Sequence, residues 1–187
     1  SYPSFSHSFS HYEQAPVLVV GRVLEVQLGA VVNEPDISPN REVREATATV
    51  EVLRSRSSTD DPAATSVGQR ILLRIYRHVD GEYRSMSGPS LPRVDEGRTY
   101  MFPLRAREGA LWRLAGDIGE LSTIMATAEP FAGAQPPATS RDFLLNEVVG
   151  ALVHGTAEEV HDSARELHGF IGEEQSPDFF ALLEAAI

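Results

Sequence analysis

Histidine is the residue type in this chain best suited to bind a metal, and three histidines recur at every seventh position: His154, His161 and His168. One continuous helix would place them on a single face. Gly155-Thr156 breaks that pattern, because glycine ends a helix and Thr156, with Glu159 three residues on, forms a capping box for the next helix. His154 and His168 each precede a glycine, where an imidazole can bond the last carbonyls of a helix. We therefore expect helix ends here and predict no metal site.

A second pair of histidines, His7 and His11, lies in a serine-rich and aromatic stretch at the amino-terminal end. The two rings could share a metal at positions i and i+4 if the stretch were helical. The stretch shows no helical or strand period. We therefore predict that residues 1–15 form a disordered leader.

Two pairs of adjacent carboxylates, Asp60-Asp61 and Asp95-Glu96, are the nearest approach to acid/base chemistry. Both lie in sequences typical of turns, and neighbours on a turn rarely converge on one substrate atom. The chain has no serine-hydrolase elbow, phosphate-binding glycine loop, zinc-protease motif or calcium loop. We predict no catalytic residues and no cofactor; the alternative is a hydrolase or metal enzyme whose site follows no recognised motif.

The remaining candidates lie on one face of a predicted strand, where Arg70, Arg74 and Tyr76 alternate with apolar residues. Thr47, Thr49 and Glu51 are expected beside them. Arginines with an aromatic ring on the middle strands of a small barrel are typical of surfaces that bind single-stranded nucleic acid. We assign these three residues as a ligand-binding candidate, with a solvated sheet face as the alternative.

Alternating apolar residues predict five strands between residues 16 and 128. The strands are expected at 16–27, with a bulge or bend at Gly21, and then at 46–53, 69–77, 98–105 and 111–114. Glycine-containing turns and a long punctuated connection at 78–97 separate them. The predicted fold is therefore mainly β with C-terminal helices, a five-stranded OB-like antiparallel Greek-key barrel followed by two or three short α-helices.

The helices follow a proline-rich linker at 129–139 and occupy an acidic segment at 140–187. Ser140 can cap the first, whose apolar stripe contains Leu145, Val148, Val149 and Leu152 and which ends at His154-Gly155. Thr156 opens the second, which ends at His168-Gly169. Ser176-Pro177 opens the third, whose buried side is expected to hold Phe179, Phe180, Leu182 and Leu183. Helices this short must pack on other parts of the protein to be stable.

The formal charge of −11 is unevenly spread along the 187 residues. Residues 141–187 hold ten acids and two arginines (net −8), whereas residues 17–128 hold fifteen acids and fourteen arginines (net −1). Binding to double-stranded nucleic acid requires clustered positive charge, so the overall balance argues against it. The longest apolar runs are also far shorter than the roughly 20 residues that cross a bilayer, so no membrane span is expected.

The chain has no cysteine, which excludes disulfides, thiol catalysis and the common structural zinc sites. Its first residue is Ser1, and removal of an upstream secretory signal would produce such a start. We therefore predict an extracytoplasmic or secreted protein, with a cytoplasmic location as the alternative. All sixteen basic residues are arginine, a bias that we attribute to a GC-rich genome.

The order VLVVGRVLEV, ATATVEVLRS, VGQRILLRIYR and EGRTYMFPLR resembles the netrin-like, tissue-inhibitor-of-metalloproteinase-like branch of the OB-fold. The resemblance covers about residues 17–114. It implies a barrel that binds partners through loops or an exposed sheet face, often in exported proteins. Inhibition in that family relies on an amino-terminal cysteine that chelates zinc; here Ser1 stands first, so the inhibitory mechanism is not carried over.

Together these observations predict a non-enzymatic, exported bacterial interaction module whose partner is a protein. The alternatives are an OB-type binder of oligonucleotide or oligosaccharide through Arg70, Arg74 and Tyr76, and the unrecognised hydrolase or metal enzyme. The sequence leaves the identity of the partner and the oligomeric state open.

Overall fold

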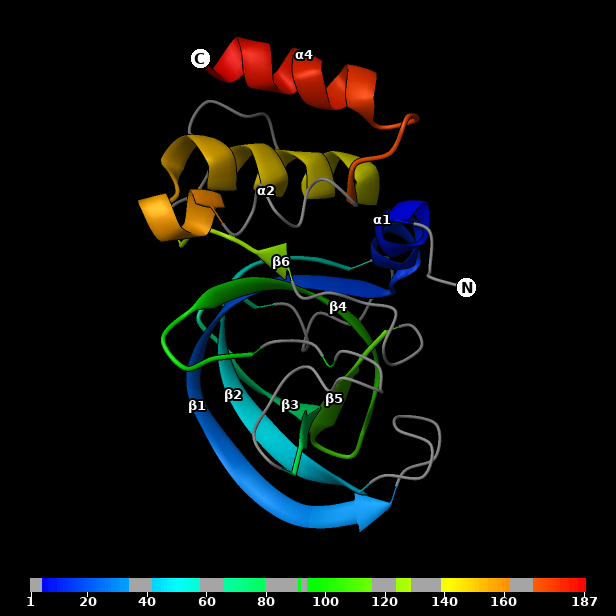
Figure 1. Ribbon diagram of the computed structural model, residues 1–187, viewed down its shortest axis with the longest axis vertical. Helices are drawn as coiled ribbons and strands as arrows, with labels where there is room; N and C mark the ends of the chain where they lie inside the picture. The colour runs from blue at the N-terminus through cyan, green and yellow to red at the C-terminus, as the bar shows by residue number, and fades with distance from the viewer. Residues whose placement is uncertain are drawn as a thin grey trace.

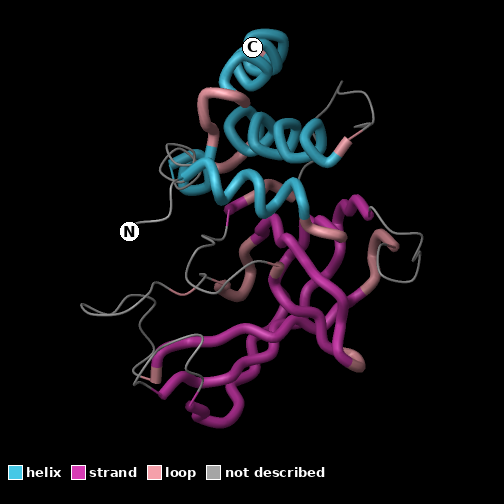
Figure 2. The backbone as a smooth tube through the Cα atoms, turned by 90° about the vertical axis from the view of Figure 1, so that its right-hand side faces the viewer, coloured by secondary structure: helices cyan, strands magenta, loops and turns pink. Residues whose placement is uncertain are grey.

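The chain forms a β-sheet with a layer of α-helices at one end of it (Figures 1 and 2). The computed structural model describes residues 5–33, 42–57, 66–79, 91, 94–115, 124–128, 139–161 and 170–187. The predicted linker at 129–139, apart from Thr139, lies outside the described residues, as do Asp60-Asp61, His168 and most of the connection at 78–97.

The fold is mainly β, and all five predicted strands are present. They are β1 (Val17–Asn33), β2 (Glu42–Ser57), β3 (Arg70–His78), β4 (Thr99–Glu108) and β5 (Leu111–Leu114), and a short strand that we did not predict, β6 (Ile124–Met125), joins them. The strands β1, β2 and β4 are longer than expected, β3 is shifted by one residue and β5 has the predicted bounds. The sheet order is β1-β2-β3-β5-β4-β6, and β1 also pairs with β4. The β3–β5 pairing is parallel, so the predicted antiparallel arrangement was wrong for this pair of strands, whereas the other pairings are antiparallel.

Two predicted local features of the sheet are confirmed. The pairing of β1 with β2 shifts register between Val20 and Gly21, where we expected a bulge. A Cβ atom at Gly21 would lie 2.2 Å from Cγ1 of Val50, so this close approach of strands requires glycine. Gly109 has a φ of 63° in the turn between β4 and β5, a backbone conformation that glycine adopts without strain.

The apolar run at the start of β1 is buried on both sides of the sheet, because each side faces a different core. We call the side of the sheet that carries Val17 and Val19 the inner side, and the side that carries Leu18 and Val20 the outer side. The sheet core on the inner side contains Val17, Val19, Val23, Ala46, Ala48, Val50, Val52, Ile71, Leu73, Ile75, Val94, Tyr100, Phe102, Leu104 and Trp112. The alternation predicted for the second, third and fourth strands is therefore confirmed.

The second core, the helix core, lies between the outer side of β1 and β4 and the helices. It contains Phe9, Tyr12, Ala15, Leu18, Val20, Met101, Ala115, Ala126, Phe143, Leu144, Leu145, Val148, Val149, Phe170 and Phe179. The helices are α1 (Phe5–Gln14), α2 (Ser140–His154), a helical stretch at residues 157–161, and α4 (Ser176–Ala186). Figure 1 shows α2 between the sheet and α4, which explains why α2 is buried over more than one stripe.

The amino-terminal segment corrects one prediction: most of the expected disordered leader at residues 1–15 is the helix α1. Phe9 and Tyr12 are fully buried, and their rings lie 5.0 and 5.3 Å from the ring of Phe170. The hydroxyl of Tyr12 also donates to the Met101 carbonyl at 3.4 Å. Burial against distant parts of the chain therefore stabilises a helix in a stretch that we expected to be disordered.

The carboxyl-terminal helices agree with the predicted caps and buried sides, with two differences. Thr139, rather than Ser140, caps α2 by accepting a hydrogen bond from the Asp142 amide at 3.1 Å. The capping box is confirmed, because the amide of Thr156 donates to Glu159 at 3.0 Å and the amide of Glu159 donates to Thr156 at 3.2 Å. On α4, Phe179 is buried but Phe180 is 58% exposed, so the predicted buried side was wrong at that position.

Candidate binding face

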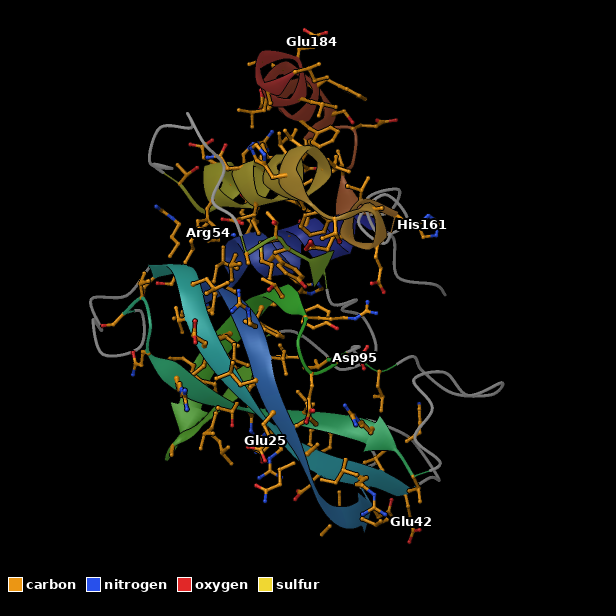
Figure 3. The ribbon with its side chains drawn as sticks, turned by 90° about the vertical axis from the view of Figure 1, so that its left-hand side faces the viewer. Glu25, Glu42, Arg54, Asp95, His161 and Glu184 are labelled. Carbon is orange, nitrogen blue, oxygen red and sulfur yellow. The ribbon has the colours of Figure 1, made fainter. Side chains whose placement is uncertain are left out.

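A half-buried arginine fixes the helices to one end of the sheet. Arg54, near the end of β2, donates from Nε and Nη2 to the two carboxylate oxygens of Glu147 on α2, at 2.7 and 2.8 Å. It also donates to the carbonyls of Thr127 and Ala128, at 2.6 and 3.2 Å. Figure 3 shows Arg54 between β2 and α2. All four contacts are internal, so this arginine is a structural link rather than a binding group.

A second link joins the turn before β4 to the helical stretch at 157–161. Arg98 forms a close ion pair with Glu158. Burial of the guanidinium lowers the pKa of Arg98, but the neighbouring carboxylate of Glu158 raises it, and the net direction is upward. The contacts of Arg54 and Arg98 hold the helices over β1 and β4. The outer side of β2, β3 and β5 forms a separate surface.

The outer side of β2, β3 and β5, which we call the open face, is partly exposed to solvent. Arg70 is exposed and Leu72 is 39% exposed, in contrast to Leu18 and Val20 on the outer side of β1, which are fully buried. The predicted neighbours are confirmed by the strand register, which places Thr47 opposite Arg74, Thr49 opposite Leu72 and Glu51 opposite Arg70.

The three predicted ligand-binding residues share this side of β3 but have different surroundings. Arg74 forms an ion pair with Glu45 at 2.7 Å. Tyr76 packs against Val43 and Leu91, so its ring belongs to a small apolar cluster. Arg70 lies opposite Glu51, which in turn lies opposite Arg22 on β1, so charges of opposite sign alternate along that row.

The sheet brings together a different set of arginines, which the sequence reasoning missed. Arg74 on β3 is the register partner of Arg113 on β5, and Arg113 is the register partner of Arg105 on β4. Their neighbours Leu73, Trp112 and Leu104 belong to the sheet core, so all three arginines point to the outer side. We call Arg74, Arg113 and Arg105 the arginine row. Neighbouring strands lie about 5 Å apart, so the backbone positions of the three arginines lie within about 10 Å of one another.

Sequence spacing alone could not have found the arginine row. Arg113 and Arg105 belong to a hairpin, and their register places them opposite each other. The placement of Arg113 beside Arg74 depends on the parallel β3–β5 pairing, which no local pattern predicts. The available signal was that Arg105 follows Leu104 and Arg113 follows Trp112, two apolar residues that face the sheet core.

The histidines and carboxylates singled out from the sequence do not form a site. His154 and His161 are exposed, and α1 places His7 and His11 one turn apart on its backbone. Glu96 accepts a hydrogen bond from the Val26 amide at 2.8 Å, and the Asp95 amide donates to the Tyr100 hydroxyl at 3.1 Å, so this pair orders a turn. Within the described parts of the chain, no group of three or more histidines and carboxylates is arranged to hold a metal ion.

Comparison with models of known protein families gives no match, and no curated protein is significantly similar to the chain in sequence. The resemblance to the netrin-like branch stays a prediction. None of the helices in the described ranges has the length and apolar character needed to cross a membrane.

Proposed function

We propose that this chain is a non-enzymatic binding module, an OB-like barrel that binds a partner protein through the open face. The order of the strand pairings supports the barrel, because it runs β1-β2-β3-β5-β4 and β4 pairs with β1 again. Such an order closes a sheet on itself, which removes most unpaired edges. The mixed pairing, with β3 parallel to β5, is compatible with a Greek-key connection.

The observation that carries this proposal is that the helices bury the outer side of β1 and β4 but not that of β2, β3 and β5. The helices bury Leu18, Val20 and Met101 on β1 and β4, whereas Leu72 at the centre of the open face is 39% exposed. Leu72 lies next to Leu111 in register and has Arg70 and Arg74 on either side of it along β3. An exposed apolar centre with an arginine-rich rim is typical of protein interfaces.

The runner-up function, binding of a single-stranded oligonucleotide or an oligosaccharide, uses the same face. Arg70 and Arg74 favour it, but the packing of Tyr76 against Val43 and Leu91 reduces the ring area that a base could stack on.

A hydrolase or metal enzyme remains a third hypothesis. Elemental analysis of the purified protein tests its metal version, which requires a stoichiometric metal.

Amide-detected NMR tests the proposed function. The labelled protein is titrated with an acidic peptide, a basic peptide, a single-stranded oligonucleotide and an oligosaccharide. We expect the shift changes caused by a peptide to cluster on β2, β3 and β5. Leu72→Glu should remove the binding, whereas Leu28→Glu, which alters another exposed leucine, should not. Changes confined to the helices, or to the oligosaccharide titration, would contradict the proposal.

The predicted extracytoplasmic location forms part of this proposal. The test is fractionation of the source cells followed by detection with an antibody. Recovery of the protein in the cytoplasmic fraction alone would contradict it.

A further inference from the structure

One edge of the second half of β1 has no pairing partner in the described parts of the chain. We call this edge, from residue 27 to residue 32, the β1 edge. We infer that the β1 edge pairs with the β1 edge of a second copy of the chain and so joins two sheets into one. The inference goes beyond the proposed function, because the open face belongs to β2, β3 and β5.

The β1 edge begins where the contacts of β1 with β4 end. β1 pairs with β4 over residues 17–22, and the amide and carbonyl of Val23 bond the turn before β4 at 2.9 and 2.8 Å. The Val26 amide then donates to the Glu96 carboxylate at 2.8 Å. Beyond Val26, the described strand beside β1 is β2, which lies on its other edge. Figure 1 shows this part of the sheet extending away from the helices.

The β1 edge is open to solvent and carries no charge. Residues 27–31 are all exposed, with Leu28 at 55% and Val31 at 38%. The sequence of the edge, QLGAVV, contains no charged residue and no proline. Natural sheets protect exposed edges with charges, proline or a covering element, and an edge without such protection is a template for another strand. The β1 edge is therefore suited to pairing.

The backbone groups of Leu28 and Val31 point away from β2. In an antiparallel ladder, successive residues alternate between bonding the partner strand and facing the other way. The Val26 amide faces away from β2, because it bonds a carboxylate of the turn before β4, and Leu28 is two residues further along. A register shift adds one residue after Leu28, and Val31 then stands opposite Arg44, two residues from the β2 partner of Leu28. Leu28 and Val31 therefore have the same phase and present their amide and carbonyl groups at the edge.

The spacing of these groups favours a second copy of the chain as the partner. A regular strand directs groups to one edge at every second residue, whereas the extra residue in β1 places Leu28 and Val31 three residues apart. The same segment of a second copy carries the same spacing. When the two segments run antiparallel, Leu28 of one copy lies opposite Val31 of the other, and the reverse holds by two-fold symmetry.

The charge of the chain supports the same choice of partner. Each copy carries a formal charge of −11, so most surfaces of two copies repel each other. At the β1 edge the residues that meet are uncharged, and the side chains of Leu28 and Val31 lie on the same side of the sheet, where they contact each other across the junction. Backbone pairing and apolar contact are therefore available without like charges between the paired residues.

Sedimentation equilibrium of the whole chain, from about 1 to about 300 µM, tests the inference, and we expect a reversible monomer–dimer equilibrium. Leu28→Glu and Val31→Lys should each weaken the dimer about tenfold or more, because each places a charge on the edge. An equimolar mixture of the two variants should regain a dimer, since the glutamate of one chain then lies opposite the lysine of the other. This recovery depends on the inferred register.

Val67→Glu is the matched control, because Val67 is 72% exposed and lies outside the β1 edge, and it should leave the dimer affinity within about twofold. Circular dichroism checks the folding of each variant. A chain that stays monomeric over the whole concentration range would overturn the inference. A dimer that neither Leu28→Glu nor Val31→Lys weakens, or a mixture that stays monomeric, would overturn the pairing of these two residues.

Amide hydrogen exchange distinguishes a second copy from an extended segment of another protein. The amides of Leu28 and Val31 should exchange about tenfold or more slowly in the dimer than in the monomer. A monomer in which these amides become protected only after a peptide is added would assign the edge to another protein and exclude the second copy. Leu28→Glu should leave the response of the open face to peptides unchanged, so the failure of one proposal is distinguishable from the failure of the other.

Discussion

At the scale of single residues, Arg54 carries the polar contact between the sheet and the helices. Its side chain is 20% exposed and that of Glu147 is 10% exposed, so neither charge is well solvated. The guanidinium binds both carboxylate oxygens and two backbone carbonyls. Removal of one partner therefore leaves several buried polar groups without hydrogen bonds, a larger cost than the loss of a surface ion pair.

We predict that Arg54→Leu lowers the free energy of unfolding by about 3 kcal/mol, because Glu147 then stays buried without its counter-charge. Urea denaturation followed by circular dichroism measures the change. Arg22→Leu alters an exposed arginine on the same sheet and should change the stability by less than about 1 kcal/mol. Equal effects of the two substitutions would show that the Arg54 contacts do not matter for stability.

Gly21 is the second residue whose role is local and testable. A methyl group there would lie 2.2 Å from Cγ1 of Val50, inside the sheet core. We predict that Gly21→Ala lowers the free energy of unfolding by about 1–3 kcal/mol, measured in the same way, because a packed core must shift. At Gly29 the nearest atom would be 3.3 Å away, so Gly29→Ala should cost less. The reverse order would contradict this account.

At the scale of secondary structure, α1 shows that a short helix can depend entirely on distant contacts. Its ten residues include three serines and two histidines, which favour a helix only weakly, although Phe5, Phe9 and Tyr12 are spaced at i, i+4 and i+7. Phe9 and Tyr12 nevertheless pack against Phe170 and the backbone of β4. The stability of the helix therefore comes from the helix core rather than from its own propensity.

We predict that Phe9→Ala lowers the free energy of unfolding by about 3–5 kcal/mol, since a fully buried ring is removed from the helix core. Thermal and urea denaturation both report the loss. Phe180→Ala is the matched control, because that ring is 58% exposed and its removal should cost much less. Similar losses at the two positions would mean that α1 is not anchored by Phe9.

These elements also show how far sequence reasoning extends. The strands β2 and β3 were predictable, because residues such as Ala48 and Ile75 alternate with polar neighbours and form the inner side. The helix α1 was not, because its partner Phe170 is remote in sequence. On the open face, Arg70 and Arg74 could be placed on one side of a strand, but Arg113 and Arg105 join Arg74 only through a parallel pairing.

At the scale of the whole molecule, the strands β1 and β4 have a core on each side. Tyr100 and Phe102 face the sheet core, whereas Met101 between them faces the helix core. The sheet and the helices therefore share two strands rather than meeting as separate units, and Figure 2 shows them at opposite ends of the same body. Neither part can lose its structure without exposing apolar residues of the other.

We predict that the sheet and the helices unfold in one cooperative transition. Trp112 is the only tryptophan and lies in the sheet core, so its fluorescence reports the sheet, while ellipticity at the helical minimum reports the helices. The two signals should give the same midpoint in urea. A helical signal that is lost at lower urea, with the fluorescence unchanged, would show that the helices form an independent unit.

The residues of the helix core are synthesised at different times on the ribosome. Leu18, Val20 and Met101 are translated before Leu144, Val149 and Phe179, which cover them. Domains fold as their residues emerge, so a sheet that forms first would expose this apolar surface until α2 and α4 follow. The nascent chain is therefore expected to bind chaperones through the outer side of β1 and β4 and to leave them once α4 has docked.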